Sequence, residues 1–361
     1  MIDGHGDDAY RYCGQIRMNF SSNIYHAADL DALQKHLAGQ LHLIGSYPEP
    51  RQRSLEQLIA RRLGIPDGCV LVTAGATEAI YLTARAVRAA FPHINRYAVM
   101  RPTFSEYDDA SIRAGFTEIE SGADDALASL RNGNTTEQKD TCNNDVLRWI
   151  CHPNNPTGEA FATEDITTVA RQGGITVVDQ SYEDYTHAPV LTPTEALRHG
   201  NVILLHSMTK TFGIPGLRIG YVTAPEAITE LIAAQTIPWS VNAMAAEAAR
   251  FLLAGNCCTT GNIDEKLDET QRLRHMLNGI DGISVMPTRT TFMLARMEHG
   301  TADRLKQWLV TNHGMLIRDC SNIRGLSPHH FRVASRSAAE NKMLADAIRE
   351  FMAYEHDITM T

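Results

Sequence analysis

The chain lacks the features of a membrane protein and of a nucleic-acid binder. Across its 361 residues, no apolar run approaches the roughly 20 residues that a membrane-spanning helix needs. Acidic side chains outnumber basic ones by 42 to 33, which gives a formal net charge of -9, and no dense basic run interrupts this balance. We therefore expect neither a membrane nor a nucleic acid as a partner.

Cysteine patterns of the kind that hold metals or disulfide frameworks are also missing. The seven cysteines form no CxxC pair and show no metal-ligand spacing with histidine. The segment 1–8 is polar and acidic, unlike a secretory signal. These absences predict reduced thiols, no metal site and a cytoplasmic location.

Short apolar runs that alternate with helical patterns indicate the fold class. Strands are predicted at 69–72, 97–100, 175–178 and 202–205, and glycine turns and helical spacing follow the first two. This alternation is typical of an α/β fold with a mostly parallel sheet between helices. The length allows one large domain and a smaller one.

The chain is expected to divide into three parts. We predict an N-terminal arm with part of the small domain at 1–45, a large cofactor-binding domain at 46–240, and a small α+β domain at 241–361. The segment 121–146 is rich in Asp, Asn, Thr, Gly and Ser, so it is expected to be mainly a solvated loop. The small domain should contain helices and strands at 242–253, 265–277, 283–286, 292–295, 302–310 and 338–354.

The segment 207–221 carries the most informative chemistry. Lys210 stands between the hydroxyl residues Thr209 and Thr211, and Arg218 follows after a Pro-Gly turn. Small hydroxyls and an arginine suit a phosphate, and a lysine held in a cleft can attack a carbonyl. Both charges could equally be solvated at the surface, so other segments must decide between the two interpretations.

Two turns at strand ends favour the first interpretation. Thr73–Glu78 places a glycine turn before a helix, where free N–H groups can bind a phosphate, although such turns are common. The double-asparagine turn at 153–158 offers the Asn155 amide as a donor to a phenolate oxygen, whereas a plain Asn-Pro turn is the alternative.

A carboxylate and an aromatic ring add to the pattern. Asp179 ends an apolar strand, so it can remain ionised only beside a cation such as a pyridinium nitrogen, unless it is a helix N-cap. Tyr182 follows three residues later and could reach the ring oxygen. Phe104, just after a strand, could stack on the ring or belong to the core.

In this order, the glycine turn, aromatic, asparagine, aspartate, lysine and arginine resemble the fold-type-I pyridoxal-phosphate enzymes of the aspartate aminotransferase superfamily, over about residues 5 to 350. The resemblance implies a seven-stranded large-domain sheet, pyridoxal 5'-phosphate as cofactor and a homodimer. It also implies that Lys210, Asp179 and Tyr182 are catalytic. The implied cofactor-binding residues are Tyr47 (reaching into the neighbouring subunit), Ala76, Thr77, Phe104, Asn155, Asp179, Tyr182, Ser207, Thr209, Lys210 and Arg218.

Within the superfamily, several segments are more similar to the threonine-phosphate decarboxylases of cobalamin synthesis than to the histidinol-phosphate aminotransferases. They are His5-Gly6, 18–24, 75–82, the Ile-Pro-Gly-Leu-Arg turn at 214–218, 239–243, 316–326 and 331–334. Two arginines can hold the two anionic ends of a small phosphorylated amino acid. By resemblance the substrate residues are His5, Gly6, Asn23, Asn155, Arg318 and Arg332.

The same residues suit two reactions, so the choice remains open. The bond that breaks at Cα must lie perpendicular to the cofactor ring, and its identity decides between loss of CO₂ and transamination. We expect decarboxylation of L-threonine O-3-phosphate, with a histidinol-phosphate-type aminotransferase as the alternative. A non-catalytic sensor domain of a transcription regulator is disfavoured, because the short acidic arm contains no basic helix-turn-helix region.

Overall fold

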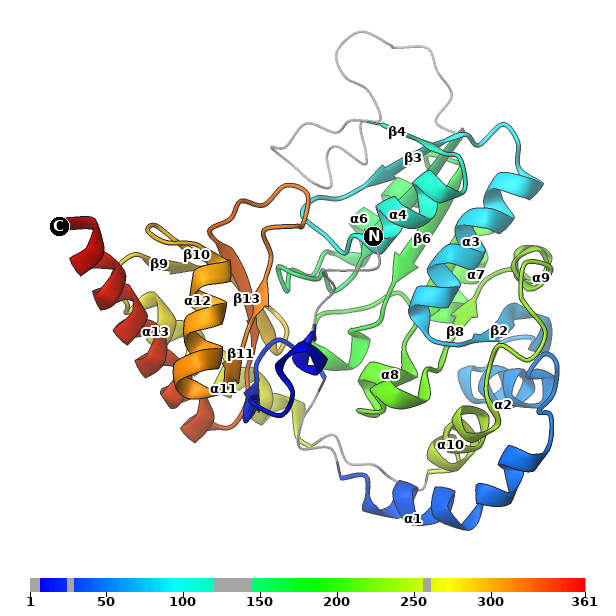
Figure 1. The fold of residues 1–361 in the computed structure, drawn as a ribbon. Coiled ribbons are helices and arrows are strands. Elements are labelled where there is room, and N and C mark those ends of the chain that lie inside the picture. The colour runs from blue at the N-terminus through cyan, green and yellow to red at the C-terminus, as the bar shows by residue number, and fades with distance from the viewer. Residues whose placement is uncertain (1–6, 25–28, 120–144, 256–260, 361) are drawn as a thin grey trace, which may run out of the picture.

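The computed structural model describes residues 7–24, 29–119, 145–255 and 261–360. They form an α/β fold with a seven-stranded sheet and a smaller four-stranded sheet beside it (Figure 1), as predicted from the sequence. None of the helices described is long and apolar enough to cross a membrane.

The large sheet is parallel except at one strand. Its order is β2-β8-β7-β6-β5-β3-β4, and β8 runs antiparallel to both of its neighbours. The central strands are fully buried apolar runs, as is usual for a sheet that is covered on both faces. The strands are β2 (Val70–Thr73), β3 (Arg96–Val99), β4 (Thr117–Glu118), β5 (Val146–Cys151), β6 (Ile175–Asp179), β7 (Val202–His206) and β8 (Gly220–Thr223).

Alternating side chains of each central strand enter different cores. In β5, Leu147 and Trp149 pack in the core under helices α3 (Ala76–Ala90), α4 (Glu106–Arg113) and α9 (Glu226–Ala233). Val146 and Ile150 face the opposite core, with α6 (Thr163–Ala170) and α7 (Pro193–His199). This period of two, with both sets apolar, explains why the sequence reads as an unbroken hydrophobic run.

The smaller sheet is antiparallel throughout, with the order β12-β13-β10-β9. Its strands and three accompanying helices share one core, and Figure 1 shows α13 along the outer side of this domain. The elements are α11 (Ile263–Asn278), β9 (Ile283–Val285), β10 (Phe292–Met297), α12 (Ala302–Trp308), β12 (Arg318–Asp319), β13 (His330–Ala334) and α13 (Ala338–Met360).

The N-terminal part of the chain contacts both units. Strand β1 (Met18–Asn19) pairs in parallel with β11 (Met315–Leu316), and Met18 lies in the core of the small domain. Helix α2 (Arg53–Leu63) shares a core with β2 and α10 (Ala243–Leu253), and α1 (Asp31–Gly39) adds Leu33 to it. The boundaries near 45 and 240 stay predictions. Most of the expected loop, residues 120–144, lies outside the described residues, and Val146 already belongs to β5.

Candidate active site

A cavity of about 480 Å³ opens at the carboxyl edge of the large sheet. Strands β2, β5, β6 and β7 run in one direction, so the segments that follow them meet at this edge. The cavity brings together thirteen of the predicted site residues, namely Asn23, Ala76, Thr77, Phe104, Asn155, Asp179, Tyr182, Ser207, Thr209, Lys210, Arg218, Arg318 and Arg332.

Lys210 lies in the short helix α8 (Met208–Thr211), directly after β7. Its Nζ atom stands 5.6 Å from the centre of the Tyr182 ring. Burial, followed by the positive charges of Arg332 and Arg218, lowers the pKa of Lys210 to about 8. A substantial fraction of this amine is therefore unprotonated near neutral pH, as a nucleophile for a carbonyl requires.

Asp179 ends β6 and is only 4% exposed. Tyr107 donates its hydroxyl to Oδ2 at 2.8 Å, and the backbone N–H of Ser181 donates to Oδ1 at 2.9 Å. Burial raises the pKa of Asp179, and the two hydrogen bonds oppose that rise. A carboxylate held this way beside a cavity is suited to pair with a cationic ring nitrogen.

The turn before α3 forms a close-fitting cradle. Gly75 has a φ of +93°, and a Cβ atom there would stand 2.7 Å from Nη2 of Arg218. Ala76 and Thr77 begin the helix, where N–H groups have no intrahelical acceptor. The guanidinium and the helix start thus provide donors for a phosphate, while Ser207 and Thr209 line the same cavity. The donor set fits pyridoxal phosphate.

Buried polar atoms without partners point to a ligand in the cavity. Asn23 donates Nδ2 to the Tyr182 hydroxyl at 3.2 Å, while its Oδ1 has no hydrogen-bond partner among the described residues. Arg332 donates Nη1 to Asn155 Oδ1 at 2.5 Å and Nη2 to the Ser21 carbonyl at 2.6 Å, yet its Nε has no partner in the described part of the chain. A bound molecule with donor and acceptor groups would satisfy both atoms.

The two predicted substrate arginines are direct cross-strand neighbours. Arg318 of β12 pairs in register with Arg332 of β13. Directly opposite residues in an antiparallel pair lie on one face, where two like charges repel each other. Arg318 also donates to Asn322 Oδ1 at 2.9 Å, a neutral partner. This pair lines the cavity and lacks a carboxylate among these contacts, so it favours an anionic ligand.

Tyr47 is absent from the lining of this cavity and is 86% exposed. Its ring contacts that of Trp239 at a centroid distance of 5.4 Å, and the Trp239 N–H donates to the Pro50 carbonyl. This placement leaves Tyr47 available to another subunit, which is the role predicted for it. His5 and Gly6 lie outside the described residues.

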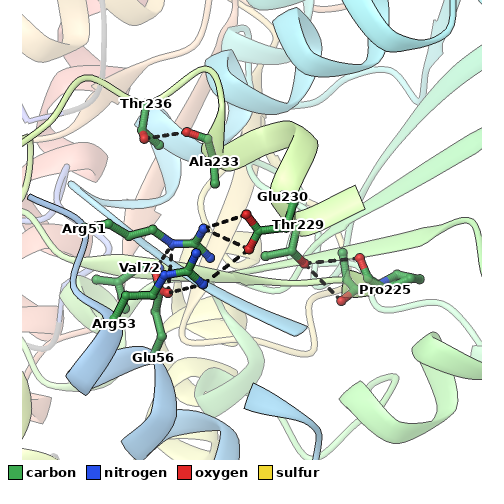
Figure 2. Close-up of polar contacts among 10 residues, drawn as sticks. Arg51, Arg53, Glu56, Val72, Pro225, Thr229, Glu230, Ala233 and Thr236 are labelled. Atoms are coloured by element: carbon green, nitrogen blue, oxygen red, sulfur yellow. Dashed lines mark hydrogen bonds and ion pairs between the residues drawn. The ribbon is translucent and has the colours of Figure 1, made fainter. Parts of the chain in front are cut away.

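The segment after Tyr47 is held by charged groups (Figure 2). Arg51 donates Nε to both oxygens of the buried Glu56 in α2, at 2.9 and 3.1 Å, and Nη1 to Glu230 of α9. Glu56 Oε1 also accepts the backbone N–H of Val72 in β2 at 3.2 Å. Arg53 adds a further contact to Glu230. One carboxylate thus connects this segment to the strand that leads into the glycine turn.

Tyr107 is the residue that sequence reasoning missed. It belongs to the quoted segment 102–107, but only Phe104 was singled out there. Phe104 lines the cavity, and its ring meets that of Tyr107 edge-on at 5.8 Å. No local pattern signals the contact with Asp179, because the two residues are 72 positions apart.

Comparison with known proteins agrees with this geometry. The profile of the family described as aminotransferase class I and II matches residues 15–348. A threonine-phosphate decarboxylase of Salmonella typhimurium is 30% identical over 348 residues, covering 93% of this chain and 91% of the relative. A histidinol-phosphate aminotransferase of Thermoanaerobacter pseudethanolicus is 29% identical over 324 residues, covering 86% and 85%. The solved L-threonine-O-3-phosphate decarboxylase of Porphyromonas gingivalis is 33% identical with a TM-score of 0.83, covering 93% of this chain and 99% of that chain.

Proposed function

This chain belongs to the class I and II aminotransferases and is a pyridoxal-phosphate enzyme, and we propose that it decarboxylates L-threonine O-3-phosphate. The product would be (R)-1-amino-2-propanol O-2-phosphate, used in cobalamin synthesis. The observation that carries the proposal is the pairing of Arg318 with Arg332 in the cavity. Threonine phosphate has a carboxylate and a phosphate a few bonds apart, which matches two adjacent guanidinium groups. Histidinol phosphate has a phosphate but no carboxylate.

The arginines would orient the substrate. Arg332, anchored through Asn155 and Ser21, presents its remaining Nε donor to one anion, and Arg318 presents a guanidinium to the other. Fixing both anions fixes the rotation about the substrate Cα–N bond, and therefore which Cα bond is perpendicular to the ring. The Asn23 Oδ1 can accept a hydrogen bond from the bound substrate.

Three residues would hold the cofactor and move protons. When bound, pyridoxal phosphate supplies an electron-accepting ring for the pair left by the broken bond. Asp179 would hold a proton on the ring nitrogen, and Tyr182, beside Asn23, would contact the ring oxygen. The Lys210 Nζ, with its pKa of about 8, is suited to deliver a proton to Cα after CO₂ leaves.

Product analysis separates the proposal from its alternative. The purified enzyme loaded with pyridoxal phosphate should release CO₂ from threonine phosphate without any oxo acid. A histidinol-phosphate-type aminotransferase is the second candidate, supported by the relative with 29% identity. It would instead convert 2-oxoglutarate to glutamate in the presence of histidinol phosphate. No CO₂ from threonine phosphate would overturn the first proposal.

We also propose a homodimer in which the partner subunit's Tyr47 completes each cavity. Tyr47 and Trp239 expose neighbouring rings, and the nearby Ile237 is also exposed. Mixing inactive Lys210→Ala with weakened Tyr47→Ala protein should restore activity, because one site of each mixed dimer then has both residues intact. A mixture no more active than its components would contradict shared sites.

A further inference from the structure

Tyr107 is a buried ionisable residue to which the proposed mechanism assigns no role. It lies in the first turn of α4 and is 1% exposed. Its ring stacks on Trp149 with a centroid distance of 5.4 Å and an interplanar angle of 15°. Trp149 is in turn fixed by a hydrogen bond from Nε1 to Ser111 Oγ at 2.9 Å. The ring of Tyr107 is therefore held in one orientation before any ligand binds.

That orientation directs the hydroxyl at the cofactor carboxylate. The Tyr107 hydroxyl donates to Asp179 Oδ2 at 2.8 Å, while the Ser181 N–H occupies Oδ1. Cys151 is also close to the hydroxyl, but a carboxylate oxygen is a better acceptor than sulfur. Two donors from different elements thus fix both oxygens of a carboxylate that ends a strand.

We propose that Tyr107 is a positioning residue that keeps the Asp179 carboxylate ionised and aimed at the ring nitrogen of the cofactor. The inference rests on the cofactor site of the proposed function, but not on which substrate the enzyme uses. A hydroxyl that donates to a carboxylate stabilises its charged form. Without that donor, burial favours the neutral acid, and the proton shared with the ring moves toward Asp179. The ring nitrogen then carries less positive charge.

The alternative is that Tyr107 only fills the core, and Tyr107→Phe separates the two roles. The substitution keeps the ring that packs on Trp149 and removes only the hydroxyl. Tyr97→Phe is a matched control, since Tyr97 is equally buried in the same core and donates to the Asp108 carboxylate at 3.0 Å, and neither residue lines the cavity. Thermal unfolding of each apoenzyme verifies that the variants fold.

The measurements use pyridoxal phosphate alone and no substrate. The ¹⁵N NMR signal of ring-labelled cofactor reports directly whether its nitrogen is protonated. We expect Tyr107→Phe to shift this signal toward the unprotonated form and to weaken cofactor binding roughly tenfold, whereas Tyr97→Phe changes neither. In an Asp179→Asn background, Tyr107→Phe should have no further effect on binding, because its partner is gone.

A wild-type nitrogen signal and wild-type affinity in Tyr107→Phe would overturn the proposal. If that variant folds poorly, Tyr107→His provides a second test, since its ring N–H can still donate to Asp179. Its bound cofactor should then retain the wild-type nitrogen signal, and a signal equal to that of Asp179→Asn would refute positioning by a donor. None of these results depends on CO₂ release, so a wrong substrate assignment is detected separately.

Discussion

Replacing Gly75 with alanine tests the phosphate end of the cavity. The backbone at Gly75 has a φ of +93°, a conformation that L side chains rarely adopt. The new Cβ would also stand 2.7 Å from Nη2 and 3.3 Å from Cζ of Arg218. Gly75→Ala therefore has two separable effects, one on the backbone and one on the guanidinium.

The two effects differ in size and in the property they change. Backbone strain of about 1–3 kcal/mol should lower the free energy of unfolding of the apoenzyme. Displacing Arg218 removes a charge-assisted hydrogen bond to the cofactor phosphate, about 1.5–3 kcal/mol. That loss corresponds to a roughly 10- to 150-fold weaker affinity for pyridoxal phosphate.

Urea unfolding measures the first effect, and titration of the apoenzyme with pyridoxal phosphate measures the second. Gly216→Ala is the control, because Gly216 belongs to the same arginine turn and a Cβ there meets no atom within 4 Å. In an Arg218→Ala background, Gly75→Ala should still lower stability but should scarcely change cofactor affinity.

Wild-type affinity for pyridoxal phosphate in Gly75→Ala would refute the assignment of Arg218 to the phosphate. An equal loss of affinity with and without the Arg218 side chain would refute the reasoning differently. It would show that the backbone of the turn, and not the guanidinium, determines phosphate binding.

Three further predictions concern other charges. Covalent uptake of pyridoxal phosphate by the apoenzyme should accelerate as pH rises to about 8, because Lys210 must lose its proton to react; stopped-flow absorbance that is independent of pH across this value would contradict it. Glu56→Gln should lower the free energy of unfolding by about 1.5–3 kcal/mol, since it breaks the buried ion pair with Arg51, whereas the exposed Glu164→Gln should have no effect in urea titrations. Arg332→Lys should reduce kcat/KM for threonine phosphate roughly a hundredfold, because an ammonium cannot reproduce the guanidinium fork; unchanged steady-state kinetics would argue against its role.

The fold and the composition of the cavity could be predicted because they follow from local patterns. Buried apolar strands imply a parallel sheet, and parallel strands end at one edge. Residues that follow such strands, such as Asp179 and Lys210, must then lie near one another, and the structure brings them to one cavity. Their individual roles remain predictions.

The missing parts depend on contacts between distant segments. The register that sets Arg318 opposite Arg332 is decided by the turn between two strands, not by their spacing of 14 positions. The hydroxyl of Tyr107 reaches Asp179 only because α4 packs on Trp149. Tyr47 stands outside the cavity of its own chain, so its function cannot be judged from one subunit.

The Glu56 carboxylate has a consequence for how two active sites would influence each other. It joins the segment after Tyr47, through Arg51, to β2 and so to the glycine turn of the same subunit. In a dimer with shared sites, that segment serves one cavity and that turn serves the other. Cofactor binding in one cavity would then alter the geometry of the second, and the two binding constants of the dimer would differ. Loosening this single carboxylate should make the sites independent.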